Sequence, residues 1–395
     1  MRILVTTEIF LAFLRLGLTS FGGPVAHLAY FRREFVQRRG WLDEHAYADL
    51  VSLCQMLPGP ASSQVGMGLG LLRGGVAGSL AAWLGFTLPS ALALVLFGLA
   101  LRGLDVAPDN AALHGLRIVA VAVVAQAVWA MGKTACPDRP RAVIALLACA
   151  ASLLRPGSVG QFAIIAGAGV FGALGLPAGP ATPALRPFAV RLGKRAGGGL
   201  LAAFALLLLA LPALAHWTQS AALDLFSRCY RAGALVFGGG HIVLPMLQVQ
   251  LVGGGVVSND VFLAGYGAAQ AVPGPLFTFA AYLGALSRTA ATGWAGATIA
   301  LVGVFLPGYL LVIGLLPLWE RARRHAAAAR ALQGINAAVV GLLLAALYTP
   351  VGTSAIGAPA DLALALVAFL FLTVGKLAPW LVVVGGAALA TLIDR

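Results

Sequence analysis

Charged side chains are scarce in this chain. Only 10% of its 395 residues are Asp, Glu, Lys or Arg, whereas a soluble globular domain carries about 25%. Hydrophobic residues make up 60% of the sequence, and the mean hydropathy is +0.94. A soluble protein of this length has too little interior to bury so many apolar side chains. The composition therefore predicts an integral membrane protein.

Residues that support metal, redox or covalent chemistry are few and scattered. The four cysteines, Cys54, Cys136, Cys149 and Cys229, form no CxxC pair and lie in or beside apolar segments, so we interpret them as small buried hydrophobic residues. The sequence contains no HExxH zinc motif, no GxSxG elbow, no P-loop and no paired carboxylates. These absences predict no metal site, no cofactor and no enzymatic activity, and they exclude an ATP-driven pump on this chain alone.

The alternation of apolar and polar residues that predicts β-strands is also lacking. The apolar runs are Leu, Ala, Val and Gly blocks of helix length, and Gly (50) and Pro (21) are abundant, as in transmembrane helices. We therefore expect an all-α polytopic membrane protein. The apolar segments lie near 3–29, 46–72, 75–101, 112–132, 141–154, 158–176, 199–217, 222–252, 261–287, 291–317, 331–348, 360–375 and 378–393.

The basic residues, which give a net charge of +13, gather in four short stretches: 32–39, 133–141, 186–195 and 320–330. Cytoplasmic loops of membrane proteins retain Lys and Arg. We therefore interpret the stretches as cytoplasmic loops, and we expect no nucleic-acid partner. Attraction of an anionic solute is a second interpretation.

The two halves of the chain resemble each other. Residues 15–24 (RLGLTSFGGP) align with residues 231–240 (RAGALVFGGG), and each half contains a later Gln followed by Pro-Gly-Pro. Matches at Arg, Gln, Gly and Pro in the same order and spacing indicate a tandem duplication.

The duplication predicts three regions. Residues 1–180 form the first repeat, 181–220 form a connector with one extra membrane helix, and 221–395 form the second repeat. An odd number of crossings in the connector turns the second repeat over relative to the first. Such inverted repeats are typical of many secondary transporters.

Each repeat interrupts its apolar segments with Phe-Gly-Gly and Pro-Gly-Pro, although proline costs a helix interior about 3 kcal/mol. If every segment spans the membrane, the basic stretches 186–195 and 320–330 fall outside. If the broken segments instead dip to mid-membrane and return, all four basic stretches lie inside, and 102–110, 253–260 and 349–359 lie outside. We favour re-entrant segments. Kinked but spanning helices are the alternative, so the expected count is about ten to thirteen membrane segments.

The breaks predict an anion site. Broken backbone in lipid is tolerated only where protein or a water-filled cavity covers it. A helix that restarts after Pro-Gly-Pro presents free N–H groups and the positive end of its dipole, and nearby hydroxyl and amide groups add donors. An intramembrane arginine is also a functional candidate. The candidate substrate-binding residues are Arg15, Gly22, Gly23, Pro24, Gln55, Pro58, Gly59, Pro60, Ser62, Ser63, Arg231, Gly238, Gly239, Gly240, Gln270, Pro273, Gly274, Pro275, Thr278 and Asn336.

Four ionisable residues are candidates for proton coupling: His27, His241, Glu8 and Asp224. The histidines could shuttle protons, or they could be ordinary hydrogen-bonded residues. The acids could instead neutralise Arg15 and Arg231. A spacing of seven residues, however, leaves about 10 Å between the partners along a helix.

The residues 13–66, with the pattern FxRLGxTSFGGPxAHLxxFRREFVxRRxWLDExxYADLxxLCQxLPGPxSSQxG, closely resemble the first half of bacterial chromate ion transporters. The sequences FGGGHIVLPML (237–247) and AVPGPLFTFAAYLGA (271–285) resemble the second half of that family. The resemblance covers nearly the whole chain. The motif residues that it carries over are Arg15, Gly22, Gly23, Pro24, His27, Gln55, Pro58, Gly59 and Pro60, with Phe237 to His241 and Pro273 to Pro275.

The resemblance implies a two-domain, multi-pass protein of the bacterial inner membrane. It implies export of chromate, driven by the proton motive force or by anion exchange, and resistance to chromate. Sulfate is the implied competitor, and a homodimer is possible. The alternative is a carrier of sulfate or another oxyanion, or an anion channel of the same fold, because no residue pattern distinguishes chromate from sulfate. Gly240 replaces Pro24 in the second repeat, so the two breaks need not have equal roles.

Overall fold

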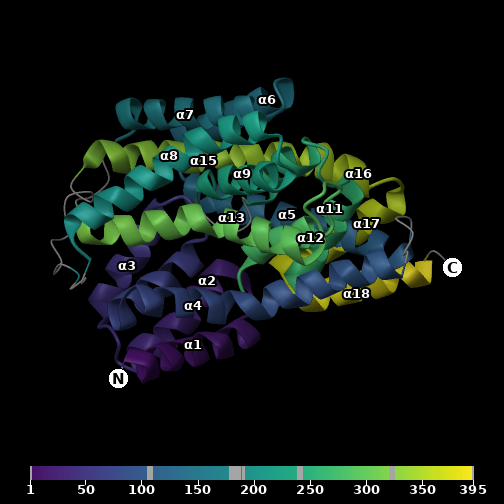
Figure 1. The fold of residues 1–395 in the computed structure, drawn as a ribbon. Helices are drawn as coiled ribbons and strands as arrows, with labels where there is room; N and C mark the ends of the chain where they lie inside the picture. Colours follow the sequence, from purple (N-terminus) through teal and green to yellow (C-terminus); the bar gives the residue numbers. More distant parts are fainter. Residues whose placement is uncertain are drawn as a thin grey trace.

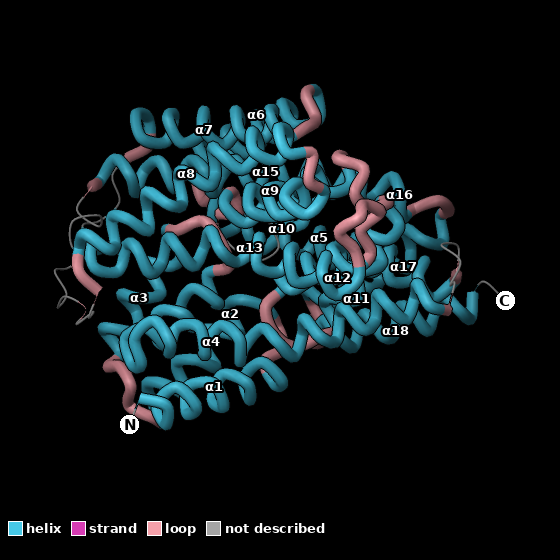
Figure 2. The backbone as a smooth tube through the Cα atoms, in the orientation of Figure 1, coloured by secondary structure: helices cyan, strands magenta, loops and turns pink. Residues whose placement is uncertain are grey.

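The structure is a computed structural model that describes residues 2–104, 110–177, 188, 192–237, 243–319 and 325–393. These residues fold into helices and connecting loops without any β-strand (Figure 2). Five helices are long and apolar enough to cross a membrane: Ala61–Gly103, Ala111–Ala135, Lys194–Thr218, Gly293–Leu318 and Ala327–Ala355. The prediction of an all-α membrane protein is confirmed.

The helices of the first half are α1 (Arg2–Thr19), α2 (Gly23–Phe31), the π-helix η1 (Arg32–Arg38), α3 (Glu44–Met56), α4 (Ala61–Gly103), α5 (Ala111–Ala135), α6 (Arg139–Leu154) and α7 (Ser158–Gly175). Helix α8 (Lys194–Thr218) follows. The second half comprises α9 (Ala221–Ala234), α10 (Val243–Leu247), η3 (Gln248–Val252), α11 (Asn259–Ala271), η4 (Leu276–Thr278), α12 (Phe279–Ala285), α13 (Gly293–Leu315), η5 (Leu316–Leu318), α15 (Ala326–Ala346), η6 (Leu347–Gly352), α16 (Thr353–Ala355), α17 (Pro359–Thr373) and α18 (Pro379–Ile393).

Polar side chains set equivalent helix starts in the two halves. Asp43 accepts a hydrogen bond from the backbone N–H of Ala46 at the start of α3, at 2.8 Å. Ser258 holds the same position before α11 and accepts from the N–H of Val261 at 3.4 Å. Each side chain satisfies one of the free N–H groups in the first helical turn.

Helix α4 is two helices that fold back on each other. Gly75 lies between them with φ +68° and ψ −159°, a conformation that glycine reaches readily. Gly70 packs against both Gly78 and Ala82, which would lie too far away along one straight helix. We call the two parts α4a (residues 61–74) and α4b (residues 76–103).

The Pro-Gly-Pro segments also fold back at their breaks. In the first half, Leu50 of α3 contacts Gly68 of α4a, although the break separates them in the chain. In the second half, the hydroxyl of Tyr282 in α12 donates to the carbonyl of Val261 in α11 at 3.1 Å. Both segments are therefore helical hairpins whose tips are the Pro-Gly-Pro turns.

The Phe-Gly-Gly segments have the same shape. The ring of Phe13 in α1 stacks on Phe35 in η1, with centroids 4.6 Å apart. In the second half, Arg228 of α9 donates to the carbonyl of Gln250 in η3 at 3.0 Å. The predicted return of each broken segment is thus present in the geometry of the chain.

The two long helices α4b and α13 show that the halves are inverted. We call the end of each hairpin opposite its tip the base. Along α4b, Gly78 packs at the base of the first-half hairpins, and Ser90 lies at the tip of a second-half hairpin. Gly98, farther along the same helix, packs on Tyr282 near the base of the second-half hairpins. Figure 1 places α3 toward one end of the molecule and α11 and α12 toward the other.

Helix α13 also passes both sets of hairpins, but it runs from the second-half base toward the first-half hairpins. Gly296 packs on Gly284 at the second-half base, and Gly308 lies at a first-half tip. The indole N–H of Trp319, just beyond the end of α13, donates to Asp49 of α3 at 3.0 Å. The hairpins of the two halves therefore start from opposite ends and meet in the middle, as an inverted repeat requires.

The remaining helices cross between halves. Helix α5 of the first half packs on α17 and α18 of the second, whereas α15 of the second half packs on α6 and α7 of the first. Small residues allow these close approaches: Gly115 of α5 lies against Gly386, and Gly334 of α15 lies against Ala168. The two halves are thus interlocked.

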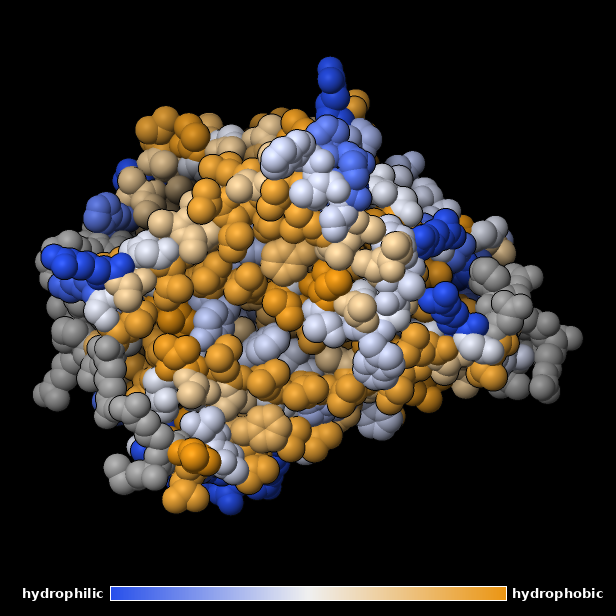
Figure 3. Space-filling view, viewed as in Figure 1, coloured by the Kyte–Doolittle hydropathy of each residue, from blue (hydrophilic) through white to orange (hydrophobic). Residues whose placement is uncertain are grey.

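The surface matches a lipid environment. A broad apolar band occupies the middle of the face seen in Figure 3, and hydrophilic residues gather toward both ends. Large apolar side chains are widely exposed, among them Phe171 of α7 and Leu209 of α8. Such contiguous apolar surface marks contact with lipid rather than water.

Candidate functional site

Four hairpin tips meet through a pair of exchanged backbone hydrogen bonds. The N–H of Gly59 donates to the carbonyl of Val236 at 2.6 Å, and the N–H of Gly274 donates to the carbonyl of Ser20 at 3.0 Å. Ser20 and Val236 each precede a Phe-Gly-Gly break in the sequence. Each Pro-Gly-Pro turn therefore bonds to the residue that precedes the Phe-Gly-Gly motif of the other half. We call this meeting point, residues 20–24, 57–60, 235–237 and 272–275, the junction.

The middle glycine of each Pro-Gly-Pro turn has no room for a side chain. Gly59 and Gly274 have φ values of +120° and +106°. A β-carbon on Gly59 would lie 3.1 Å from the α-carbon of Gly308, and one on Gly274 would lie 2.8 Å from the hydroxyl of Ser90. Gly308 and Ser90 follow Pro307 and Pro89, the matching prolines inside α13 and α4b. The junction thus brings together, in each half, the Pro-Gly-Pro turn and the proline inside a long helix.

The first-half side of the junction is polar and buried. His27 of α2 is 1% exposed, and its Nε2 lies 3.2 Å from the carbonyl oxygen of Ser20. Its Nδ1 lies 3.3 Å from the hydroxyl of Ser62. Because a carbonyl only accepts, Nε2 carries the hydrogen in neutral His27, and the Ser62 hydroxyl donates to Nδ1.

Gln64 ties this side to the second half and was missed by the sequence reasoning. Its Nε2 donates to the carbonyls of Pro58 at 2.9 Å and Gly308 at 3.2 Å. These two acceptors fix the orientation of the amide. Its Oε1 is buried and has no partner among the described residues. The available signal was the run Ser62-Ser63-Gln64 directly after the first Pro-Gly-Pro turn.

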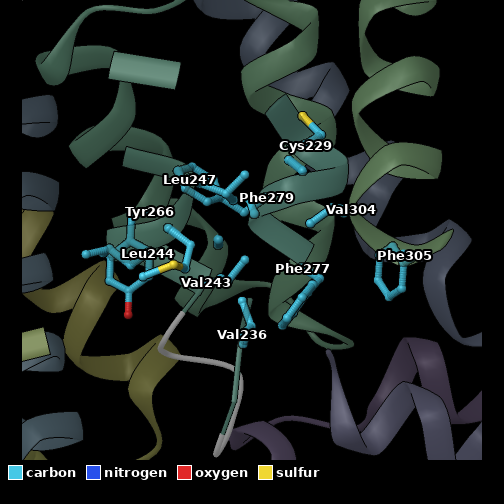
Figure 4. Close-up of a cluster of buried hydrophobic side chains, with 14 of the residues drawn as sticks. Cys229, Val236, Val243, Leu244, Leu247, Tyr266, Phe277, Phe279, Val304 and Phe305 are labelled. Carbon is cyan, nitrogen blue, oxygen red and sulfur yellow. The ribbon is translucent and has the colours of Figure 1, made fainter. Parts of the chain in front are cut away.

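The second-half side is apolar in comparison. Phe277 and Phe279 occupy the positions that Ser62 and Gln64 hold in the first half, and both are buried. Figure 4 shows them in an apolar cluster with Val236, Val304 and Phe305. The two Pro-Gly-Pro tips therefore share a similar backbone turn, but polar side chains follow the first turn and phenylalanines follow the second.

One hydroxyl pair makes the difference sharper. Thr278 donates to the carbonyl of Pro275 at 2.7 Å. Ser63, its counterpart in the repeat, is 2% exposed, and its hydroxyl has no partner within the described residues. In the first Pro-Gly-Pro hairpin the Ser63 hydroxyl is therefore available to a ligand, whereas in the second the Thr278 hydroxyl is bound to the backbone of its own turn.

The first Pro-Gly-Pro tip also contains the start of a helix. Helix α4a begins after Pro60, which provides no side-chain cap, and the first intrahelical bond joins the N–H of Gln64 to the carbonyl of Pro60. The N–H groups of the first turn therefore lack helical acceptors. In the second half, the chain passes through the short turn η4 before α12. The first half has the better donor set for an anion.

The two repeat arginines lie in different environments. Arg15 is exposed on α1 and lines an open groove with Tyr30 and Arg33. Arg231 of α9 is half-buried, and its Nε has no partner among the described residues. The structure therefore does not bring Arg15 to the junction.

The two acidic candidates bind other arginines. Glu8 contacts Arg39 at 3.1 Å and Arg73 at 3.7 Å, and Asp224 contacts Arg228 at 2.7 Å. These contacts hold both carboxylates away from the tips, at the hairpin bases or along α9.

The other candidates are dispersed. Gln55 is exposed on α3, whereas Gln270 is half-buried at the end of α11 with its Nε2 unpartnered in the described structure. Asn336 is half-buried on α15. Gly22, Gly23 and Pro24 form the first Phe-Gly-Gly tip, with positive φ at both glycines. Gly238, Gly239, Gly240 and His241 lie outside the described residues.

Comparison with known proteins gives a consistent family assignment. A family model described as chromate transporter matches residues 7–173 and 223–391. The chain is 31% identical to a chromate transport protein of Pseudomonas aeruginosa, over 85% of this chain and 79% of that protein. It is 26% identical to a chromate transport protein of Cupriavidus metallidurans, over 96% and 91% of the two chains. A probable chromate transport protein of Synechococcus elongatus is 27% identical, over 85% and 81%. No solved structure matches.

Proposed function

The chain belongs to the chromate transporter family, and on this premise we propose that it is a secondary active transporter that exports chromate across the bacterial inner membrane and so confers resistance. The observation that carries the proposal is the junction, where hairpin tips of two inverted halves exchange backbone hydrogen bonds. Inverted repeats around a midplane site are the architecture of alternating-access carriers.

Chromate is a doubly charged tetrahedral oxyanion, so its binding must replace lost hydration with several hydrogen-bond donors. The first Pro-Gly-Pro tip offers the N–H groups at the start of α4a and the hydroxyls of the buried residues Ser62 and Ser63. The positive end of a helix dipole adds to the attraction. We place the substrate at this tip.

His27 supplies a route for proton coupling. While the ring is neutral, the Ser62 hydroxyl hydrogen is directed to Nδ1, which lies 3.3 Å away. A protonated ring donates from both nitrogens, so the Ser62 hydroxyl hydrogen becomes available to the anion. Protonation of His27 and anion binding at Ser62 should therefore favour each other.

The membrane potential supports export. Moving one elementary charge through 100 mV is worth about 2.3 kcal/mol, and a negative interior drives an anion outward. A carrier that releases chromate with one proton still moves net negative charge out of the cell.

Flux into proteoliposomes tests the proposal. We expect chromate to accumulate against its gradient when a membrane potential or pH gradient is imposed, and a protonophore to abolish the accumulation. Purely downhill flux would indicate a channel. Uphill flux of sulfate with no transport of chromate would identify a carrier of a different oxyanion.

Variants at the first tip test the placement of the substrate. Ser62→Ala and Ser63→Ala each remove a donor, and we expect chromate flux to fall about tenfold or more, because a hydrogen bond to a charged group is worth about 1.5–3 kcal/mol. Ser52→Ala is the matched control, since this exposed hydroxyl bonds only to the carbonyl of Ala48 in its own helix. Unchanged flux in both tip variants would move the site elsewhere.

A further inference from the structure

An open groove lies between α1 and η1 on the first Phe-Gly-Gly hairpin. Arg15 contributes from α1, Tyr30 from the end of α2, and Arg33, Glu34 and Arg38 from η1. The opposite face of α1 packs on α4, where Phe13 is buried and Gly17 lies against Gly85. The groove therefore lies on the face of α1 that points away from α4.

The described acidic residues balance only part of the positive charge of the groove. Glu34 binds Arg39 at 2.7 Å and Arg38 at 3.1 Å. Burial raises the pKa of Glu34, but the hydrogen bonds from Arg39 and Arg38 outweigh it and keep the pKa below its usual value. Arg15 and Arg33 have no acidic partner among the described residues. Both remain available to an anion.

Arg15 also lies within an apolar stripe. Leu4, Leu11 and Leu18 of α1 are 75%, 57% and 56% exposed, and their spacing of seven places them on one helix face. Arg15 follows Leu11 by four positions and precedes Leu18 by three, so it belongs to the same face. An arginine beside lipid-facing leucines extends toward the headgroup layer and needs an anionic partner there.

We propose that the groove binds the phosphate of an anionic phospholipid between Arg15 and Arg33. An acyl chain then extends from the phosphate toward the hairpin tip past Leu18, and Tyr30 occupies the membrane–water interface that aromatic residues prefer. A lipid accounts for both the charge of the groove and the apolar stripe beside it, whereas a free oxyanion accounts only for the charge. This site is independent of the transport proposal, and it assigns Arg15 to lipid.

Native mass spectrometry of the purified full-length protein tests the site, with phosphatidylglycerol and phosphatidylcholine as the probes. We expect the wild-type protein to retain phosphatidylglycerol in preference to phosphatidylcholine. Arg15→Gln and Arg33→Gln should each weaken retention about fivefold, the effect expected for one basic residue near the membrane surface. Arg155→Gln, at an exposed arginine between α6 and α7, should behave like the wild type.

Two results would overturn the proposal. One is equal retention of phosphatidylglycerol by the wild type, Arg15→Gln and Arg33→Gln. The other is displacement of the lipid by millimolar chromate or inorganic phosphate, which would identify the groove as a binding site for soluble anions. The two variants are on different elements, so misfolding of one, detected as a lower melting temperature in lipid-free detergent, leaves the other as the test. Loss of lipid retention with normal chromate flux would separate this site from the transport site.

Discussion

At the scale of single residues, the middle glycines of the Pro-Gly-Pro turns decide whether the hairpin tips can meet. Gly59 and Gly274 combine a positive φ with contact to the opposite half, at Gly308 and Ser90. A side chain at either position would crowd atoms of the opposite half and would also require an unfavourable backbone conformation. The same glycines also donate the hydrogen bonds exchanged between the halves.

Gly59→Ala should therefore lower the melting temperature in detergent and remove most chromate flux. The left-handed backbone alone costs an alanine about 1–2 kcal/mol, and the crowding against Gly308 adds to it. Gly40→Ala is the matched control, because Gly40 has φ +59° but open space around it. Similar melting temperatures for the two variants would show that crowding at the junction is unimportant.

Gln64→Met should destabilise the protein by about 1–3 kcal/mol, because the carbonyls of Pro58 and Gly308 lose a buried donor. The change is measured as a shift in thermal or denaturant unfolding in detergent. Phe279 holds the equivalent position in the second half and makes no such bond, so Phe279→Leu should cost only packing. An unaffected Gln64→Met protein would contradict the role of the amide as a bridge between halves.

The sequence was informative about which residue types gather at the breaks, and less so about where each one points. Gly59, Ser62 and His27 lie at or beside the junction, as their positions near the breaks suggested. Arg15 does not, because the face of a helix that packs inward depends on neighbours such as Gly85 that are distant in the chain. The repeat alignment likewise could not reveal that one tip is polar and the other is filled by phenylalanines.

At the scale of elements, the chain folds back on itself at its breaks. The lengths and the loop charges predicted such a reversal, and it is present in the contacts of Leu50 with Gly68 and of Tyr282 with Val261. That the hairpins enter the membrane without crossing it stays a prediction. The reversal at Gly75 also separates 46–72 from the following apolar segment, as predicted. The π-helix η1 was not foreseen, because its hydrogen-bond pattern leaves no periodic trace in a stretch of seven residues.

Contacts of charged side chains join elements from different halves near α11 and α17. Arg117 of α5 binds Asp260 of α11 at 2.6 Å, and Arg102 of α4b donates to the hydroxyl of Thr292 at 3.2 Å. Nearby, His114 of α5 binds Asp361 of α17 at 3.0 Å. Two of these contacts include a residue of the stretches predicted to lie outside, Arg102 and Asp260, and each binds a residue of the other half.

Asp361→Asn should lower the melting temperature at pH 7. Burial raises the pKa of Asp361, but hydrogen bonds from His114 and from the N–H groups of Gly357 and Ala358 outweigh it and leave the pKa below its usual value. A lowered folded-state pKa gives stability that is present above the unfolded-state pKa of about 4 and is lost as the pH falls through the folded value. The difference from the wild type should persist at pH 5 and shrink only in stronger acid. A difference that vanished between pH 7 and pH 5 would mean that the carboxylate is not the group responsible.

At the scale of the whole molecule, the halves are interlocked rather than merely adjacent. Helix α5 packs against α11, α17 and α18 of the second half, α15 packs against α6 and α7 of the first half, and the tips exchange hydrogen bonds. The duplication predicted two related units, but pairing across them depends on complementary small-residue surfaces such as Gly115 against Gly386. No local pattern in either half specifies its partner.

Cutting the chain between residues 177 and 192 tests this interlocking. Each half alone should fail to accumulate in the membrane, because α5 or α15 would expose surface that normally packs on the other half. Co-expression of both halves should restore a complex that co-purifies and transports chromate. Stable, separately purified halves would show that each is an independent folding unit.

The two long helices have a further consequence. On α4b, Gly78 and Gly98 mark the contacts with the two sets of hairpin bases, and twenty residues of helix rise about 30 Å. This equals the hydrocarbon thickness of a typical bilayer, about 30 Å. The distance between the two sets of hairpin bases therefore matches the thickness of the hydrocarbon core. Lipids with shorter or longer acyl chains should strain the bases relative to the tips, so that turnover passes through an optimum at the matching chain length.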